Sequence, residues 1–207
     1  INSNIDTVVE LIGGSDPAKE YVREALNYKK NVVTANKEII ASSIEELTSE
    51  AHLNKVKIRF EAAVGAGIPL IEVLIDMLKQ NKISKITGII NGTSNYILSS
   101  MHDSNKSFDD SLKEAQNLGF AESDPTNDIG GFDAMYKVSI LGSIAFGSKV
   151  PIESISVKGI ENLSQKDISY SKELGFVIKL LAVTENKSSK IYSNVAPYLV
   201  PENHPLA

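Results

Sequence analysis

Two apolar runs, each followed by a helical segment, constrain the fold of the first part of this chain most strongly. TVVELIGG (residues 7–14) and NVVTAN (residues 31–36) are short apolar runs of the kind that form buried strands. Apolar residues at helical spacing follow each run, in residues 15–30 and 37–54. This alternation predicts parallel strands with right-handed crossovers, so we expect a doubly wound, Rossmann-type α/β arrangement.

Local signals predict where these two helices begin and which face each one buries. Ser15 or Asp16 is expected to cap the first helix, because both residue types accept hydrogen bonds from helix N–H groups, and Pro17 suits its first turn. The predicted buried positions are Ala18, Tyr21, Val22, Ala25 and Leu26 in the first helix, and Ile40, Ile44 and Leu47 in the second.

The rest of the chain mixes strands and helices without a regular alternation. Further strands are expected at residues 56–67, 82–91, 155–160, 176–185 and 190–200, the last two joined by a polar turn. Further helices are expected at residues 68–81, 92–104, 107–119, 132–147 and 164–175. Thr93 or Ser94 is expected to cap the helix at 92–104, and Ser107 the next one. This order favours an α+β region with a mixed sheet.

Composition excludes several kinds of function. The 207 residues carry a formal net charge of −5, which argues against a nucleic-acid or membrane-surface partner. There is no cysteine, so a thiolate nucleophile and a Cys-ligated zinc are excluded. No secretory signal opens the chain and no apolar run is long enough for a membrane span, so we expect a cytoplasmic protein.

The chemistry-bearing residues concentrate in GFAESDPTNDIGGFDAMYK, residues 119–137. Glu122, Asp124 and Asp128 precede a predicted helix that begins near residue 132 and is otherwise apolar. Asp133 and Lys137 lie one turn apart on that helix and therefore share a face. The face continues into apolar positions, so the pair is predicted to lie on a buried stripe, where a charge needs a partner.

Three interpretations of this segment remain open on the residues alone. Asp133 and Lys137 can form an ion pair that only stabilises the helix start. If the acids of the loop converge, they suit a substrate that carries an ammonium group, and the lysine can give or take a proton at a carbonyl oxygen. The acids can also hold a divalent cation, although the lysine would compete with the metal for the same carboxylates.

Six segments in order give the chain a specific resemblance. They are VVTANKE, FEAAVGAGIPLI, ITGIINGTSNYIL, AQNLGFAESDPTNDIGGFDAMYKVSILGSIAFG, DISYSKELGFVIKLLA and LVPENHPLA. Together they resemble the homoserine dehydrogenase family over essentially the whole chain. The resemblance implies reduction of aspartate 4-semialdehyde to homoserine with NADH or NADPH, on the route to threonine, methionine and isoleucine. The lack of cysteine fits, because oxidation of the same aldehyde to an acyl group usually proceeds through a cysteine thioester.

The resemblance also implies a domain organisation. Residues 1–55 match the C-terminal part of a nucleotide-binding domain, and residues 56–207 match a substrate-binding, catalytic and dimerisation domain. A homodimer is implied, with a small-molecule substrate. No G-x-G-x-x-G follows a strand, so we expect the phosphate-binding turn before residue 1, and weak cofactor binding and little activity in these 207 residues alone.

Residue roles follow from the same resemblance. The implied catalytic residues are Lys137, which transfers the proton, and Asp133, its partner. The implied substrate-binding residues are Glu122, Asp128, Gly92, Thr93 and Lys37. The implied cofactor-binding residues are Thr34, Asn36 and Lys37. A monovalent cation such as Na⁺ is implied at Glu61 and the carbonyl groups of Val64, Ala66 and Ile68. In the alternative interpretation, the glycines of this segment, Gly65 and Gly67, serve only to bend the chain.

Two other functions remain as alternatives to homoserine dehydrogenase. One is another two-domain, nicotinamide-dependent dehydrogenase that acts on an amino-acid aldehyde or a keto acid. The other is a dimerisation module without catalytic activity. Replacement of Lys137 separates the catalytic from the non-catalytic alternative, and a comparison of hydroxy amino acids as substrates separates the two enzymes.

Overall fold

The computed structural model describes residues 4–207, which fold into two compact units. The first unit contains the described residues up to Ser84 together with Ser139–Ile152. The second unit contains Lys85–Val138 together with Glu153–Ala207. The helix α7 (Phe132–Phe146) has residues in both units.

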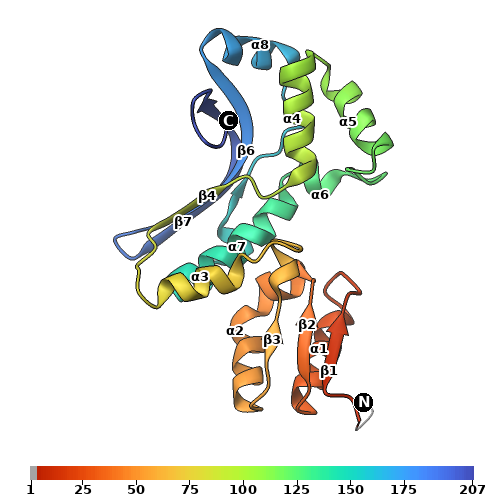
Figure 1. Ribbon diagram of the computed structural model, residues 1–207, viewed down its shortest axis with the longest axis vertical. Helices are drawn as coiled ribbons and strands as arrows, with labels where there is room; N and C mark the ends of the chain where they lie inside the picture. The colour runs from red at the N-terminus through yellow and green to blue at the C-terminus, as the bar shows by residue number, and fades with distance from the viewer. Residues whose placement is uncertain (1–3) are drawn as a thin grey trace. The chain divides into compact units, whose positions relative to one another are not determined.

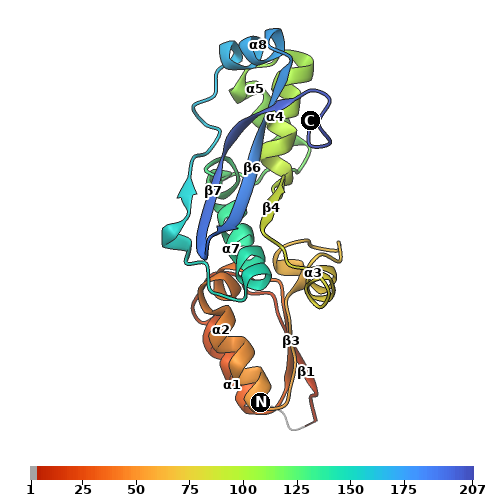
Figure 2. The same cartoon turned by 90° about the vertical axis from the view of Figure 1, so that its left-hand side faces the viewer.

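A parallel sheet is the framework of the first unit. Its strands are β1 (Thr7–Glu10), β2 (Asn31–Thr34) and β3 (Ile58–Arg59), paired in that order. The crossover helices are α1 (Ala18–Asn27) and α2 (Lys37–Leu53). Both strand pairings are parallel, and the two helices cover the same face of the sheet (Figure 1, Figure 2). The predicted parallel α/β arrangement is confirmed.

Apolar side chains between these helices and the sheet form the core of the first unit. The fully buried ones include Val22, Ala25, Leu26, Val32, Ile39, Ile40 and Leu47. Full burial of one aliphatic side chain stabilises a fold by about 1.5–3 kcal/mol. Tyr21, which the helical spacing assigned to the buried face, is 50% exposed, so that prediction is wrong. Its phenol group has a polar end that tolerates water.

The starts of the first two helices differ in how they are capped. The residue before α1 is Pro17, and no side chain caps this helix, so the predicted cap at Ser15 or Asp16 is wrong. The side-chain oxygen of Asn36 caps α2 by accepting the N–H groups of Glu38 at 3.1 Å and Ile39 at 3.3 Å. The second helix therefore begins at a defined residue directly after β2.

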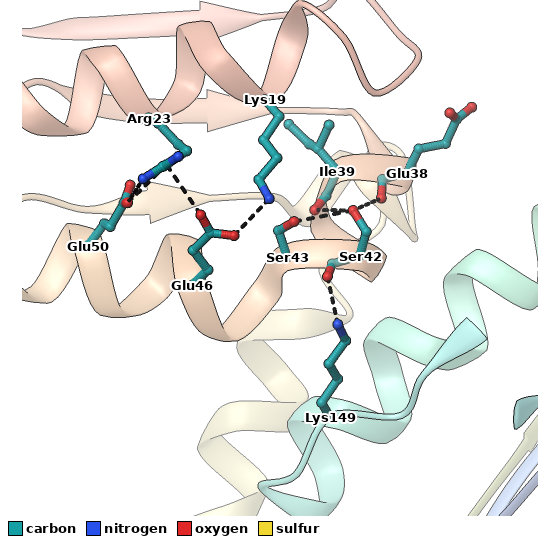
Figure 3. Close-up of polar contacts among 9 residues, drawn as sticks. All are labelled: Lys19, Arg23, Glu38, Ile39, Ser42, Ser43, Glu46, Glu50 and Lys149. Carbon is teal, nitrogen blue, oxygen red and sulfur yellow. Dashed lines mark hydrogen bonds and ion pairs between the residues drawn. The ribbon is translucent and has the colours of Figure 1, made fainter. Parts of the chain in front are cut away.

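Polar contacts connect α1 to α2 and accompany a kink in α2 (Figure 3). Lys19 and Arg23 of α1 form ion pairs with Glu46 at 2.7 Å and Glu50 at 2.8 Å, respectively. These pairs are partly exposed, and surface pairs of this kind each contribute about 0–1 kcal/mol. Ser43 has a non-helical backbone with φ −137°, and the carbonyl of the preceding residue accepts a hydrogen bond from Lys149. At the kink, the carbonyl of Ser42 therefore accepts a hydrogen bond from a side chain.

The segment after β3 turns earlier than its sequence pattern predicts. The strand expected over residues 56–67 ends at Arg59, and the short helix η1 (Glu61–Ala63) follows. The N–H of Ala63 bonds back to the carbonyl of Phe60, which closes the turn. Helix α3 (Ile71–Leu78) then begins after the glycine-containing loop.

A mixed sheet organises the second unit, as predicted. Its strands are β4 (Lys85–Gly88), β5 (Ser156–Val157), β6 (Phe176–Lys187) and β7 (Lys190–Pro201), in the order β4-β6-β7-β5. β6 pairs antiparallel with β4 and β7, whereas β5 pairs parallel with β7. Ser188 and Ser189 join β6 to β7 with φ values of 50° and 64°, the left-handed backbone that a two-residue hairpin turn requires.

Helices pack on this sheet and on one another. They are α4 (Gly92–Ser104), α5 (Phe108–Asn117), the short α6 (Thr126–Ile129) and α8 (Gln165–Glu173), with a 3₁₀ turn η2 (Ile152–Ser154) before β5. α4 packs against β6, and both α5 and α8 pack against α4 (Figure 1). Ile97, Leu98 and Met101 of α4 are fully buried. Within residues 4–207, no helix has the length and apolarity needed to cross a lipid bilayer.

Three helix caps in the second unit test the predicted helix starts. Ser107 accepts the N–H of the third helical residue of α5 at 3.1 Å, as predicted. Ser164 caps α8 in a complete capping box. The cap of α4 is Asn91, so the predicted cap at Thr93 or Ser94 is wrong. Asn91 has an extended backbone, as an N-cap residue does, whereas Thr93 and Ser94 already lie inside the helix.

Candidate active site

Asp133 and Lys137 form an ion pair on the first turns of α7. The distance from Lys137 Nζ to Asp133 Oδ2 is 2.7 Å, and the side chains are 18% and 6% exposed, respectively. Helical spacing alone predicted this contact, because residues four apart lie on one face. The carboxylate also lies near the positive end of the helix dipole, which stabilises its negative charge.

The ammonium group of Lys137 has one other partner in the described part of the chain. Its Nζ donates to the carbonyl oxygen of Ile90 at 3.1 Å. An ammonium group carries three N–H donors. Within residues 4–207, two donors are therefore used, by Asp133 and Ile90, and the third is available to an oxygen of a bound molecule.

Asn91 brings Asp128 to this pair. Its side-chain nitrogen donates to Asp128 Oδ1 at 2.6 Å and to Asp133 Oδ2 at 2.9 Å. Asp128 thus joins the lysine–aspartate pair, as the sequence led us to expect. Asn91 itself was missed because it was assigned to the end of the predicted strand 82–91, although an asparagine directly before a predicted helix is a recognisable cap signal.

Backbone contacts hold the loop that carries Asp128. The hydroxyl of Ser94 on α4 donates to the carbonyl of Asp128 at 2.7 Å. The N–H of Ile160 donates to the carbonyl of Ile129 at 2.8 Å. Gly159 lies so close to this loop that a β-carbon there would meet the carbonyl oxygen of Ile129 at 2.3 Å. The loop is therefore held between α4 and the segment after β5.

The other two acids of the motif do not join the cluster. Glu122 is exposed, and its backbone carbonyl accepts a hydrogen bond from Gln116 Nε2 at 3.1 Å. Asp124 is also exposed and accepts the hydroxyl and the N–H of Thr126 at 2.6 and 3.1 Å. These two hydrogen bonds, the hydroxyl's first, lower the pKa of Asp124. Asp124 therefore has a local role at the start of α6.

Gly92 and Thr93 begin α4 directly after Asn91. Thr93 is buried, and its hydroxyl donates to the carbonyl of Phe120 at 2.7 Å, so this side chain holds the start of the acidic segment. Gly92 is exposed, and a β-carbon there would meet no atom within 4 Å. The space beside Gly92 is open to a ligand.

In the first unit, the predicted cofactor residues lie where β1 and β2 end. Thr34 donates to the buried carboxylate of Glu10 at 2.5 Å and accepts the N–H of Asn36 at 2.9 Å. The side-chain nitrogen of Asn36 donates to the carbonyl of Gly14 at 2.7 Å. Lys37 is the first residue of α2. Glu10, which no sequence motif indicated, organises this edge, where parallel α/β sheets bind ligands.

The carboxylate of Glu61 has a structural role that the sequence did not indicate. It accepts the N–H groups of Leu70, of Ile71 at 2.6 Å and of Glu72 at 3.2 Å, so it caps the N-terminus of α3. Ala66, one of the expected carbonyl ligands, has a left-handed backbone with φ 51°. Among the described residues, no three His, Cys, Asp or Glu side chains are grouped as a metal site.

The two units and the polar cluster together indicate a class of protein. A parallel α/β unit, and a mixed-sheet unit whose polar centre is a lysine–aspartate pair, are typical of two-domain α/β oxidoreductases. Residues 69–207 match the family model described as homoserine dehydrogenase, and residues 1–61 match the model of the homoserine dehydrogenase NAD binding domain. The chain belongs to the homoserine dehydrogenase family.

Relatives and solved structures agree with this assignment. The chain is 45% identical over 204 residues to homoserine dehydrogenase of Bacillus subtilis, a match covering 99% of this chain and 47% of the relative. The enzyme of Neisseria gonorrhoeae is 47% identical over the same shares of the two chains. The chain thus spans about half the length of the curated relatives it matches.

Two solved structures extend the comparison to three dimensions. A homoserine dehydrogenase from Thiobacillus denitrificans has a TM-score of 0.93 and 48% identity, covering 97% of this chain and 47% of the other. A hyperthermophilic archaeal homoserine dehydrogenase, solved in complex with NADPH, has a TM-score of 0.81 and 32% identity. That match covers 97% of this chain and 58% of the other.

Proposed function

We propose that this chain provides the catalytic part of a homoserine dehydrogenase, which interconverts aspartate 4-semialdehyde and homoserine with NADPH or NADH. The reaction serves the synthesis of threonine, methionine and isoleucine. The observation that carries the proposal is the ammonium group of Lys137, which is held by Asp133 and Ile90 and keeps one N–H donor for a substrate oxygen.

Different groups supply the hydride and the proton for aldehyde reduction. The nicotinamide cofactor, when bound, supplies the hydride that adds to the carbonyl carbon. Lys137 donates a proton to the carbonyl oxygen, so that the aldehyde becomes a primary alcohol. Asp133 orients the ammonium and stabilises its charge. In the reverse direction, the neutral amine of Lys137 accepts the proton of the alcohol.

Charge in the cluster suits the amino-acid end of the substrate. Asp128 and Asp133 carry two negative charges against the single positive charge of Lys137. Asp128, with the exposed Glu122, provides carboxylates for the substrate ammonium group, and hydrogen bonds of this kind contribute about 1.5–3 kcal/mol. Gly92 and Thr93 complete the proposed contacts with the substrate.

The first unit provides the proposed cofactor contacts. Thr34 and Asn36 shape the ends of β1 and β2 through Glu10, while Lys37 at the start of α2 brings a positive charge to that edge. The buried hydrogen bonds of Thr34 and Asn36 suit a supporting role, in which they position the backbone that meets the cofactor. For Na⁺, the proposed ligands are Glu61 and the carbonyls of Val64, Ala66 and Ile68.

Domain organisation and assembly belong to the same proposal. Residues 1–55 are assigned to the nucleotide-binding domain and residues 56–207 to the catalytic domain of a cytoplasmic homodimer. Support for the dimer comes from a cavity of about 310 Å³ on the second unit, which is lined by the exposed side chains of Tyr170, Leu174 and Leu199. Exposed apolar groups gathered in this way are typical of interfaces.

The test is NADPH consumption with aspartate 4-semialdehyde by the natural full-length protein. Lys137→Met should lower kcat by about 10²–10⁴-fold, because proton transfer is lost. The matched control is Lys106→Met, which removes another lysine from a 2.7 Å ion pair, with Glu114. The control should retain wild-type kcat. A Lys137→Met variant with wild-type kcat would disprove the assignment.

Substrate choice separates homoserine dehydrogenase from a related dehydrogenase. In the oxidation direction, homoserine should be preferred over hydroxy acids that lack an ammonium group, because Asp128 and Glu122 would then have no cation to bind. Equal kcat/KM for homoserine and for 4-hydroxybutyrate would contradict the proposed substrate.

A further inference from the structure

Asn91 stands between β4 and α4 and is only 6% exposed. Its side-chain oxygen accepts the N–H of Ser94 at 2.8 Å, which makes it the N-cap of α4. Its side-chain nitrogen donates to Asp128 and Asp133, which lie 37 and 42 residues further along the chain. One buried amide therefore joins the start of α4 to two carboxylates of the acidic motif.

The partners of this amide determine its orientation. An amide oxygen only accepts hydrogen bonds and an amide nitrogen only donates them. Because the oxygen is taken by the N–H of Ser94, the nitrogen must face the carboxylates. Both N–H groups are then used, one by Asp128 Oδ1 and the other by Asp133 Oδ2. The opposite orientation would place the amide oxygen against two negative charges.

The contact with Asp133 reaches the lysine directly. Asn91 and Lys137 donate to the same oxygen, Oδ2 of Asp133, at 2.9 and 2.7 Å. Lys137 also donates to the carbonyl of Ile90, the residue before Asn91. The adjacent residues 90 and 91 therefore contact both members of the ion pair, so a shift of this segment moves the carboxylate and the ammonium together.

Capping of α4 does not account for these contacts. A cap needs only an acceptor, and serine provides it at two other helices of this chain, at Ser107 and Ser164. The two N–H donors of Asn91 contribute nothing to the cap. They do contribute to the approach of two carboxylates, which repel each other unless donors compensate their charge.

We propose that Asn91 is a positioning residue for proton transfer. Its amide holds Asp133 in the orientation that places the Lys137 ammonium, and it holds Asp128 beside that pair for the substrate ammonium group. The inference rests on the proposed function of Lys137 and goes beyond it, because it assigns a role to a side chain that need not touch the substrate. Asn91 acts through Asp133 and Asp128.

The experiment separates the acceptor of Asn91 from its donors. Asn91→Ser keeps an acceptor for the helix cap and replaces the two amide N–H donors by one hydroxyl on a shorter side chain, without adding charge. Asn91→Asp also keeps the acceptor but places a third carboxylate beside Asp128 and Asp133. Both variants are made in the natural full-length protein. kcat and KM are measured from NADPH consumption with aspartate 4-semialdehyde, and the melting temperature is measured for each variant.

We expect Asn91→Ser to lower kcat about 10–100-fold, because misplacing a reacting group by about 1 Å can cost up to about 100-fold. Its melting temperature should stay close to that of the wild type, because the cap remains. Ser164→Ala is the matched control: it removes a cap that lies outside the cluster, so it should lower the melting temperature and leave kcat unchanged.

The pH profile gives a second readout that a purely structural role would not change. Asn91→Asp should be impaired at neutral pH and should recover part of its kcat relative to wild type as the pH falls. The reason is that the new carboxyl group, crowded by two others, gains a proton and with it one O–H donor. A constant ratio to wild type at all pH values would overturn the positioning role.

The outcomes separate this inference from the proposed function. A wild-type protein that does not reduce the aldehyde refutes the proposed function and, with it, a role for Asn91 in proton transfer. An active wild type with an equally active Asn91→Ser refutes only the inference and leaves Asn91 as a helix cap. An active wild type, a slow and stable Asn91→Ser and a pH-dependent Asn91→Asp support it.

Discussion

Gly131 lies so close to Val195 that a β-carbon on residue 131 would come within 3.2 Å of Val195 Cγ1. The same β-carbon would come equally close to Val157 on the neighbouring strand. Gly131 also has φ 83°, a backbone conformation that favours glycine. The residue directly before α7 is thus pressed against β5 and β7, and Asp133 and Lys137 follow it on the helix.

Gly131→Ala should destabilise the protein by about 1–3 kcal/mol, because the added methyl group meets two valines and the backbone is strained. The measurement is the free energy of unfolding in urea. Gly119→Ala is the matched control, since Gly119 has a similar φ of 78° but open space around it. The control should lose only the stability that the strained backbone costs. Equal losses in the two variants would show that Val157 and Val195 move aside to accommodate the added methyl group.

Thr34→Val should destabilise the first unit by about 1–3 kcal/mol, because it removes one of the donors to the buried Glu10 carboxylate, which keeps the N–H of Ile12, and leaves the Asn36 N–H without an acceptor. Urea unfolding measures the loss. Thr34→Ser retains the hydroxyl and should stay within about 1 kcal/mol of wild type. If the serine and valine variants lose the same amount, the hydroxyl contributes nothing at this edge.

Glu61→Gln should destabilise the protein by about 1–2 kcal/mol, because an amide oxygen replaces the charged cap of α3 and an amide nitrogen faces helix N–H groups. Thermal unfolding with and without Na⁺ measures this loss and tests the proposed cation site together. If Glu61 also binds Na⁺, the salt should raise the wild-type melting temperature more than that of the variant. Glu72→Gln, at an exposed position on α3, is the control.

The stability of the protein should depend on pH because of Lys179. Burial lowers the pKa of Lys179, and the nearby Asp103 only partly opposes this effect. The folded protein therefore binds fewer protons than the unfolded chain between the folded-state pKa and the unfolded value of about 10.4. Across that interval the free energy of unfolding should rise with pH, and the destabilisation by the buried charge is fully present below it.

Lys179→Met removes the buried charge, so its advantage over wild type in free energy of unfolding should shrink as the pH rises from the lowered folded-state pKa of Lys179 toward the unfolded value of about 10.4. Urea unfolding at several pH values gives the comparison. Lys106→Met controls for the loss of a lysine, because the ion pair with Glu114, chiefly its hydrogen bond, raises the pKa of Lys106. A difference between Lys179→Met and wild type that stays constant with pH would contradict the assigned cause.

Local patterns in the sequence predicted several contacts between residues that are close in the chain, although they misplaced the caps of α1 and α4. The contact between Asp133 and Lys137 follows from helical spacing, and the cap at Ser107 follows from its position three residues before Asp110. The parallel order of β1 and β2 follows from the alternation of apolar runs and helices. In each case the geometry of one helix or one crossover connection determines the outcome, so neighbouring residues carry the information.

Only the tertiary structure decided which distant groups share hydrogen bonds. Asn91 meets Asp128 and Asp133 across 37 and 42 residues, and Glu10 meets Thr34 across 24. Whether a carboxylate joins a cluster, as Asp128 does, or stays exposed, as Glu122 does, depends on how loops pack against the sheet. Chain spacing places no limit on such contacts, because burial and the need to pair buried polar groups select them only when the whole unit has folded.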